Sequence, residues 1–297
     1  MKAYNIVPLV VSALLPAIGC AHGSGAGGVV VHQRAFLAAD GAGVRAATLL
    51  DTGEDPPALE IERIDACGSA VVERLPAGEA AAVAAAVRDG AAIEAALPSR
   101  LGAAAPAWRV AFVAGPPFDG HRVRTVPVED RRGDHQAIVL FDPAGRVVEL
   151  ARVHPDARVR VAPVPGGNPA RAMARIEGPG GTIDLRILDL AAGARAIAAA
   201  GGEEALERGD AAAALRAADE AAAHGAGSCA ASGAPAWLRA RALAASGAAA
   251  EAILDALARA IEVDPSLYRM YARTSEALAF LRGDPRFDAL VAPRPLR

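Results

Sequence analysis

Apolar and polar residues alternate in several short runs in the first third of the chain. Leu59 and Ile61, for example, are separated by Glu60 and Glu62, which is the period-two pattern of a strand with one buried face. Turn-forming sequences rich in Asp, Gly and Pro lie between these runs. We therefore expect short β-strands from Val29 onward.

The alternation stops in the Ala-rich stretch 79–97. Val83 and Val87 lie one helical turn apart, which predicts a single helix, although Gly90 weakens it by about 1 kcal/mol relative to Ala. The segment that follows is rich in Pro, Gly and Ala, which is typical of a connector. Residues 29–107 are thus predicted to form a mixed β/α region.

The β-pattern returns over residues 108–190, where short hydrophobic runs are separated by turn sequences. The turn at Asp142–Gly145 has Pro in second place and Gly in last, which suits a type I turn between antiparallel strands. The glycine pairs of this region complete neither a phosphate-binding loop nor a dinucleotide-binding fingerprint. These features predict an antiparallel β-rich domain without a nucleotide fold.

Residues 191–297 show helical periodicity in place of the alternation. Ile253, Leu257 and Ile261 form one apolar stripe at positions i, i+4 and i+8 of a helix. Gly247 lies just before this helix and predicts a turn between it and the preceding one. The region is therefore predicted to consist of paired helices.

Trp237, the phrase AIEVDP and the spacing to Pro265 resemble the tetratricopeptide repeat, a stack of helical hairpins. An earlier copy of the repeat has small residues at the family's small positions, namely Gly202, Gly209, Ala214 and Ala221. Ala240, Arg241 and Ala244 depart from the family pattern, which has Leu, Gly and Tyr there. The resemblance implies two stacked hairpins, and a generic array of helical hairpins is the alternative.

The C-terminal sequence LRGDPRFDAL predicts a short capping helix. Asp284 suits the N-cap, and Pro285 suits the first helical position, where its missing N–H has no partner to lose. Phe287, Leu290 and Val291 then form a small apolar face that would cover the last repeat. The segment also resembles the one that closes many bacterial tetratricopeptide arrays.

Together these patterns predict an α+β fold, in which N-terminal and central antiparallel β-rich regions precede a C-terminal α-helical array. We expect an export signal, a flexible tether, a mixed β/α region, an antiparallel β-rich domain and a helical domain with its cap. These five segments correspond to residues 1–19, 20–28, 29–107, 108–190 and 191–297.

The N-terminus has the pattern of an export signal. Lys2 precedes the apolar run Ile6–Ile18, which is too short to span a bilayer and has the length of a secretory signal core. The sequence Ala-Ile-Gly-Cys that ends at Cys20 resembles the lipobox of bacterial lipoproteins, and this resemblance implies lipidation of Cys20. The Gly/Ser/Ala-rich tract that follows suits a tether. Ordinary cleavage near Cys20 and an uncleaved N-terminus are the alternatives.

Charge and motif content narrow the classes of function. With 34 acidic and 31 basic residues the chain has no basic face for phosphates, so we expect no nucleic-acid partner. One polar segment is dense in carboxylates and imidazoles, but it lacks the spacing of metal ligands, and we expect neither a metal nor another cofactor. No nucleophile motif is present, and no catalytic residue is predicted. The residues of the polar segment are Asp119, His121, Glu129, Asp130, Asp134 and His135.

The chain has three cysteines, and lipidation of Cys20 would leave two that can form a disulfide. Disulfides persist in the oxidising envelope. Cys67 and Cys229 then form a candidate disulfide, because each lies in a turn-like or loop-like sequence. The competing interpretation is two free thiols, with Cys67 buried as a small apolar residue.

The tetratricopeptide resemblance assigns partner binding to the first helix of each pair. The residues it selects are Ala199, Glu203, Leu206, Leu238, Ala242 and Ala245. This small, mostly apolar lining fits an apolar helix of a protein partner or the chain's own β-domain, although the alanines also suit plain packing of helix on helix.

We therefore expect a non-catalytic scaffold that is lipid-anchored in the cell envelope, periplasm-facing or at the outer membrane, and binds a protein partner. The alternatives are an envelope enzyme or ligand-binding protein that uses residues 108–190, and an accessory that only braces other lipoproteins.

Overall fold

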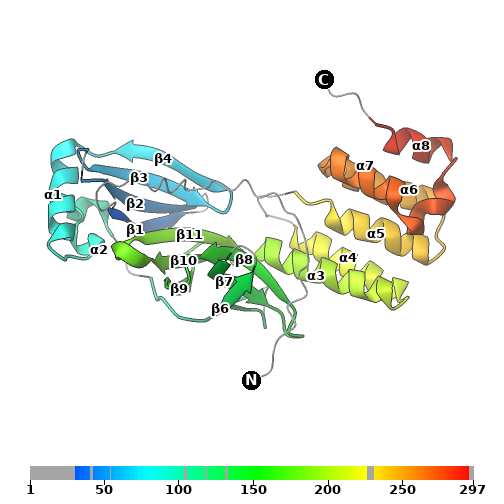
Figure 1. Ribbon diagram of the computed structural model, residues 1–297, viewed down its shortest axis with the longest axis horizontal. Helices are drawn as coiled ribbons and strands as arrows, with labels where there is room; N and C mark the ends of the chain where they lie inside the picture. The colour runs from blue at the N-terminus through cyan, green and yellow to red at the C-terminus, as the bar shows by residue number, and fades with distance from the viewer. Residues whose placement is uncertain are drawn as a thin grey trace. The chain divides into compact units, whose positions relative to one another are not determined.

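The computed structural model (Figure 1) describes residues 31–40, 43–53, 55–103, 106–116, 118, 120–130, 133–225 and 231–293. Strands occupy the N-terminal and central parts of the chain and helices the C-terminal part, so the predicted α+β class is confirmed. The described residues fall into two compact units. The sheet unit has the residues up to 114 with 123–139 and 151–188, and the helical unit has 115–122, 140–150 and those from 189 onward.

Two sheets contain the described strands. These are β1 (Val31–Asp40), β2 (Gly43–Asp51), β3 (Ala58–Asp65), β4 (Gly68–Arg74), β5 (Phe112–Val113), β6 (Arg122–Asp130), β7 (Gly133–Phe141), β8 (Val147–Val153), β9 (Arg158–Pro163), β10 (Arg171–Glu177) and β11 (Ile183–Asp189). The seven-stranded sheet has the order β4-β3-β2-β1-β11-β10-β9, and the four-stranded sheet has the order β5-β6-β7-β8.

The seven-stranded sheet crosses the predicted boundary between the regions 29–107 and 108–190, because β1 pairs with β11. Strands from 29–107 and from 108–190 share the seven-stranded sheet. β1 to β4 form an antiparallel meander and β9 pairs antiparallel with β10, whereas β1 and β11 run parallel with Gln33 opposite Ile183. Alternation along the sequence shows which face of a strand is buried but not which distant strand becomes its neighbour.

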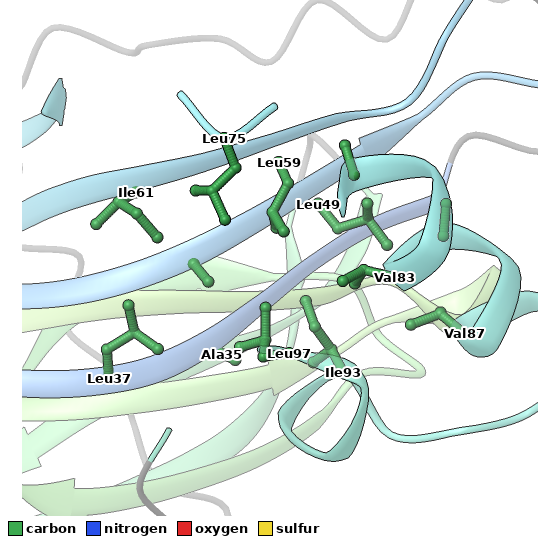
Figure 2. Close-up of a cluster of buried hydrophobic side chains, with 13 residues drawn as sticks. Ala35, Leu37, Leu49, Leu59, Ile61, Leu75, Val83, Val87, Ile93 and Leu97 are labelled. Carbon is green, nitrogen blue, oxygen red and sulfur yellow. The ribbon is translucent and has the colours of Figure 1, made fainter. Parts of the chain in front are cut away.

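The helices α1 (Ala77–Arg88) and α2 (Ile93–Ala96) pack on the seven-stranded sheet, as Figure 2 shows. Leu49 of β2 and Ile61 of β3 have no exposed surface in this core, which also contains Val83 of α1. Full burial of such a side chain stabilises the fold by roughly 1.5–3 kcal/mol. The single helix predicted over 79–97 is divided, because Gly90 takes the left-handed φ of 93° just after α1 ends.

Arg34 of β1 lies at the centre of an ionic network between strands. Its guanidinium lies 2.6 Å from Asp184 of β11 and 2.9 Å from Glu62 of β3. Thr48 of β2 accepts a hydrogen bond from Arg34 Nε at 3.3 Å and donates one to Glu62 at 2.9 Å. Burial, followed by the nearby Arg34 charge, lowers the pKa of His32, so this imidazole is neutral at pH 7. The network joins four consecutive strands of the sheet.

Seven helical segments form most of the helical unit. They are α3 (Leu190–Glu207), α4 (Ala211–His224), α5 (Ala234–Ala245), α6 (Ala250–Val263), α7 (Pro265–Thr274), the 3₁₀ helix η3 (Glu276–Leu281) and α8 (Pro285–Val291). The predicted start of the last helix is confirmed, because Asp284 accepts a hydrogen bond from the Arg286 backbone N–H at 2.8 Å and Pro285 is the first helical residue. Phe287 of this helix is buried.

The helices pack through small residues. The predicted stripe of Ile253, Leu257 and Ile261 is buried in α6. Gly202 of α3 lies where a Cβ atom would overlap Leu238 of α5 and lie 3.1 Å from the Cβ of Ala217 in α4. Glycine at this position therefore sets how closely three helices approach.

The turn between β7 and β8 belongs to the helical unit. Gly145 donates its backbone N–H to the Asp142 carbonyl at 3.0 Å, as the predicted turn requires. A Cβ on Gly193 of α3 would lie 2.9 Å from Leu140 and 2.8 Å from Leu150, so the helix packs directly on this hairpin. The predicted helical domain at 191–297 therefore includes an earlier segment that a linear division of the sequence leaves out.

A second earlier segment, 115–122, also belongs to the helical unit. Phe118 is buried and stacks on His224 at the end of α4, with ring centroids 5.5 Å apart. Burial lowers the pKa of His224, while Glu220, 3.8 Å away, opposes the shift. The neutral imidazole that results is suited to lie against an apolar ring.

Replacing Gly202 with Ala is expected to destabilise the protein by about 1–3 kcal/mol, because the added methyl group would overlap the buried Leu238 side chain and force the packing there to shift. The matched control is Gly78→Ala in α1, where a Cβ meets no atom within 4 Å. That change should stabilise the helix by up to about 1 kcal/mol. Urea denaturation of the two variants measures both effects, and equal stability of Gly202→Ala and wild type would contradict the close helix approach.

Candidate functional site

An aromatic cluster lies where α5 meets α7. The ring of Trp237 lies 6.1 Å from that of Tyr268 and 5.9 Å from that of Tyr271, and the two tyrosine rings meet edge to face at 6.1 Å. Tyr268 is buried, whereas Tyr271 is 39% exposed and Trp237 is half-buried. We call Trp237, Tyr268 and Tyr271, with Arg241, the aromatic face.

Arg241 holds one edge of the aromatic face in place. Its guanidinium lies 5.9 Å from the centroid of the Trp237 ring, within the range of a cation–π contact. The same guanidinium forms an ion pair with Glu203 of α3. Arg241 therefore links the ring on α5 to the first helix of the unit.

Tyr268 anchors the face in the core of the helical unit. Burial, followed by the Asp264 charge, raises the pKa of its phenol to about 12, so the hydroxyl is un-ionised at neutral pH. A Cβ on Gly233 would lie 2.8 Å from the Ala260 carbonyl oxygen and would overlap the Tyr268 ring. Because Gly233, just before α5, has no side chain, the Tyr268 ring of α7 can pack against the start of α5.

The six residues predicted to line a partner surface differ in exposure. Leu238 and Ala242 are fully buried with Ala205 of α3 and Ala214 of α4, so these two pack helix on helix and offer no surface. The four others retain some exposed surface, and one of them, Glu203, forms the ion pair with Arg241. These four are Ala199, Glu203, Leu206 and Ala245.

Sequence patterns missed the aromatic face although its residues are visible in the sequence. Trp237 reads as a repeat marker, while Tyr268 and Tyr271 are spaced i, i+3 on α7, which places their rings on one helix face. Their meeting with Trp237 depends on how two helices pack. The spacing of the tyrosines was the available signal.

The polar segment considered as a metal site is spread over a loop and a hairpin. His121 lies in the loop, with its ring centroid 6.2 Å from that of Phe118. Asp130, at the end of β6, forms an ion pair with Arg152 at 3.0 Å. In the part of the chain that the structure describes, no group of three or more His, Cys, Asp or Glu residues could hold a metal ion. The hairpin holds Glu129, Asp130, Asp134 and His135, and Asp119 lies outside the described residues.

No protein-family model matches the chain, and no curated protein or solved structure is significantly similar to it. None of the described helices is both long enough and apolar enough to cross a membrane. The predicted export signal, Cys20 and the tether lie outside the described residues.

Cys67 lies in the tight turn between β3 and β4. The Asp65 carboxylate accepts hydrogen bonds from the backbone N–H groups of Cys67 at 2.7 Å and Gly68 at 3.0 Å, and the residue is exposed. Cys67 is disulfide-bonded. Its partner lies outside the described residues, so pairing with Cys229 stays a prediction.

Peptide mapping of the protein purified from the envelope under non-reducing conditions should yield a Cys67–Cys229 peptide. The expectation follows because the chain has three cysteines and a lipid on the Cys20 sulfur leaves Cys229 as the available partner. Free thiols at both positions would contradict the pairing. A bond between Cys67 and Cys20 would contradict both the pairing and the lipidation of Cys20.

Proposed function

We propose that the protein is a non-catalytic interaction protein of the cell envelope, whose helical unit binds a protein partner through the aromatic face. The observation that carries this proposal is the contact of the Trp237 ring with the Tyr271 ring, which brings together two aromatic residues that each retain exposed surface. Trp, Tyr and Arg are the residue types that supply most of the binding energy at protein interfaces.

The aromatic face is suited to binding because its side chains are already held in place. Tyr268 is fixed by burial, and Arg241 is fixed between the Trp237 ring and Glu203. A preorganised surface loses less side-chain freedom when a partner binds. The partner we infer is an amphipathic helix, whose apolar side chains would lie against the rings.

The resemblance to tetratricopeptide repeats supports the same location. In that family the first helix of each pair lines the partner surface, and α5, which carries Trp237, begins the second of the two pairs in the resemblance. Tyr271 lies on α7, the helix that follows this pair. The sequence predicted Leu238 and Ala242 as partner-binding residues, but both are buried. The surface proposed here uses Trp237 and Tyr271, which a partner can reach.

A photo-crosslinking side chain in place of Tyr271 should form a defined adduct with the partner in the native envelope. The same substitution at Val72, which is 50% exposed on β4, is the negative control. Trp237→Ala should weaken the interaction roughly 30-fold, the loss expected when an interface tryptophan that contributes about 2 kcal/mol is truncated.

Phe280→Ala serves as the matched control, because it removes an aromatic ring that is 61% exposed on η3 and outside the aromatic face. An adduct that persists in Trp237→Ala, or that forms equally well from the Val72 position, would contradict the proposal. Circular dichroism of each variant separates loss of binding from loss of folding.

We further propose that the chain is exported and anchored by a lipid on Cys20. The apolar run before Cys20 and its resemblance to the lipobox support this position. The anchor would hold the folded units at a membrane surface, facing the periplasm or at the outer membrane, through the Gly/Ser/Ala-rich tether.

Cys20→Ala should release the protein from membranes into a soluble exported fraction, because the lipid is the only membrane attachment that the proposal includes. Fractionation followed by immunoblotting measures the shift, with Ser24→Ala as the control that changes the tether but keeps Cys20. Membrane retention of Cys20→Ala equal to that of wild type would contradict lipidation.

A further inference from the structure

A groove of about 520 Å³ lies within the sheet unit, at the free edge of the seven-stranded sheet. This volume falls within the roughly 300–1,000 Å³ of small-molecule sites. The groove is lined by Trp108–Val110, Thr125 of β6, Gln136 of β7, and Ala157–Arg160 at the start of β9.

The groove exists because the pairing of β9 stops early. β9 is the last strand of the seven-stranded sheet, and of the described residues beyond its outer edge Arg109 pairs with it, through backbone hydrogen bonds of 2.9 and 2.7 Å to Val161. Strand alternation directs the Val159 amide to the same edge as that of Val161. Gln136 donates to the Ala157 carbonyl at 3.1 Å and so links β7 to the start of this edge.

Three arginines line the groove, and none has an ion pair with a described residue. These residues are Arg109, Arg158 and Arg160. The carboxylates near Arg158 and Arg160 already form ion pairs with another arginine. Glu177 lies opposite Arg158 but pairs with Arg175 at 3.1 Å, and Arg175, which lies opposite Arg160, also pairs with Glu94.

The groove is therefore locally positive, although the formal net charge of the whole chain is −3. Arg158 and Arg160 lie two residues apart on one strand, so their side chains point to the same face and repel each other. An anion between them would remove this repulsion. A guanidinium binds phosphate or carboxylate through two parallel hydrogen bonds, and it stays charged at any pH the protein meets.

We propose that this groove binds a small organic anion with at least two negative charges, in the chemical class of phosphate and diphosphate esters. The guanidinium groups of Arg158 and Arg160, which share one face of β9, would hold the phosphate oxygens, with Thr125 as an additional donor. Arg109 pairs with Val161, so its side chain lies on the other face of the strand. Trp108 and Val110, which is 73% exposed, would contact the apolar part of the ligand. The site lies in the sheet unit and does not depend on the aromatic face.

The test is calorimetric titration of the full chain with inorganic pyrophosphate at low ionic strength, together with its melting temperature with and without pyrophosphate. Wild type should bind and become more thermostable, because a ligand that binds only the folded state stabilises it. The double variant Arg158→Gln, Arg160→Gln should bind about tenfold or more weakly, since it loses two charge-assisted contacts.

The matched control is the double variant Arg45→Gln, Arg63→Gln. These arginines are exposed, lie opposite each other on β2 and β3, and are outside the groove, so the change in net charge is identical. Unchanged binding by this control supports the groove. Equal weakening by both double variants, or no binding by wild type, overturns the proposal.

Flotation with phosphatidylcholine vesicles, with or without phosphatidylglycerol, identifies the source of the phosphate. Extra binding to phosphatidylglycerol that pyrophosphate displaces and Arg158→Gln, Arg160→Gln abolishes points to a lipid headgroup. Pyrophosphate binding without a difference between the two vesicle types points to a soluble phosphate compound. Extra vesicle binding that neither pyrophosphate nor the groove variant reduces overturns the proposal.

Discussion

The ion pairs of Arg34 with Asp184 and Glu62 hold the sheet unit together where its two groups of strands meet. β1 to β4 carry the core beneath α1 and α2, and β9 to β11 carry the arginine-lined groove. The parallel β1–β11 pairing joins these groups, and Arg34 crosses it. Loss of Arg34 would leave Glu62, whose side chain is 10% exposed, without this ion pair, which is far more destabilising than loss of an exposed pair. The groove therefore depends on a contact that none of its own residues makes.

The two proposed sites use opposite physical principles. The aromatic face offers rings that are neutral and preorganised, so binding there would come from apolar contact and shape. The groove offers the guanidinium groups of Arg158 and Arg160, which have no ion pair with a described residue, so binding there would come from charge and would weaken as salt increases. The first suits a macromolecular partner and the second a small anion, and each site lies within one compact unit.

Local sequence patterns predicted the features whose causes are local. The stripe of Ile253, Leu257 and Ile261, the start of α8 at Asp284 and the turn at Asp142–Gly145 each follow from a few neighbouring residues. Features that depend on distant partners were missed or misplaced. The β1–β11 pairing, the burial of Leu238 and the meeting of Trp237 with Tyr271 all require knowledge of which elements pack together. For the candidate sites, residue types could be read from the sequence but their grouping could not.

The inclusion of 115–122 and 140–150 in the helical unit has a consequence for how that unit folds. An ordinary array of helical repeats contains only contacts between near neighbours in sequence, so folding can start anywhere and spread. Here Phe118 must reach His224, and Leu140 must reach Gly193, before the helices have their full set of neighbours. Contacts between residues so distant in sequence slow folding, because a long loop has to close first. The helical unit is thus expected to fold with the slower kinetics of a protein of higher contact order.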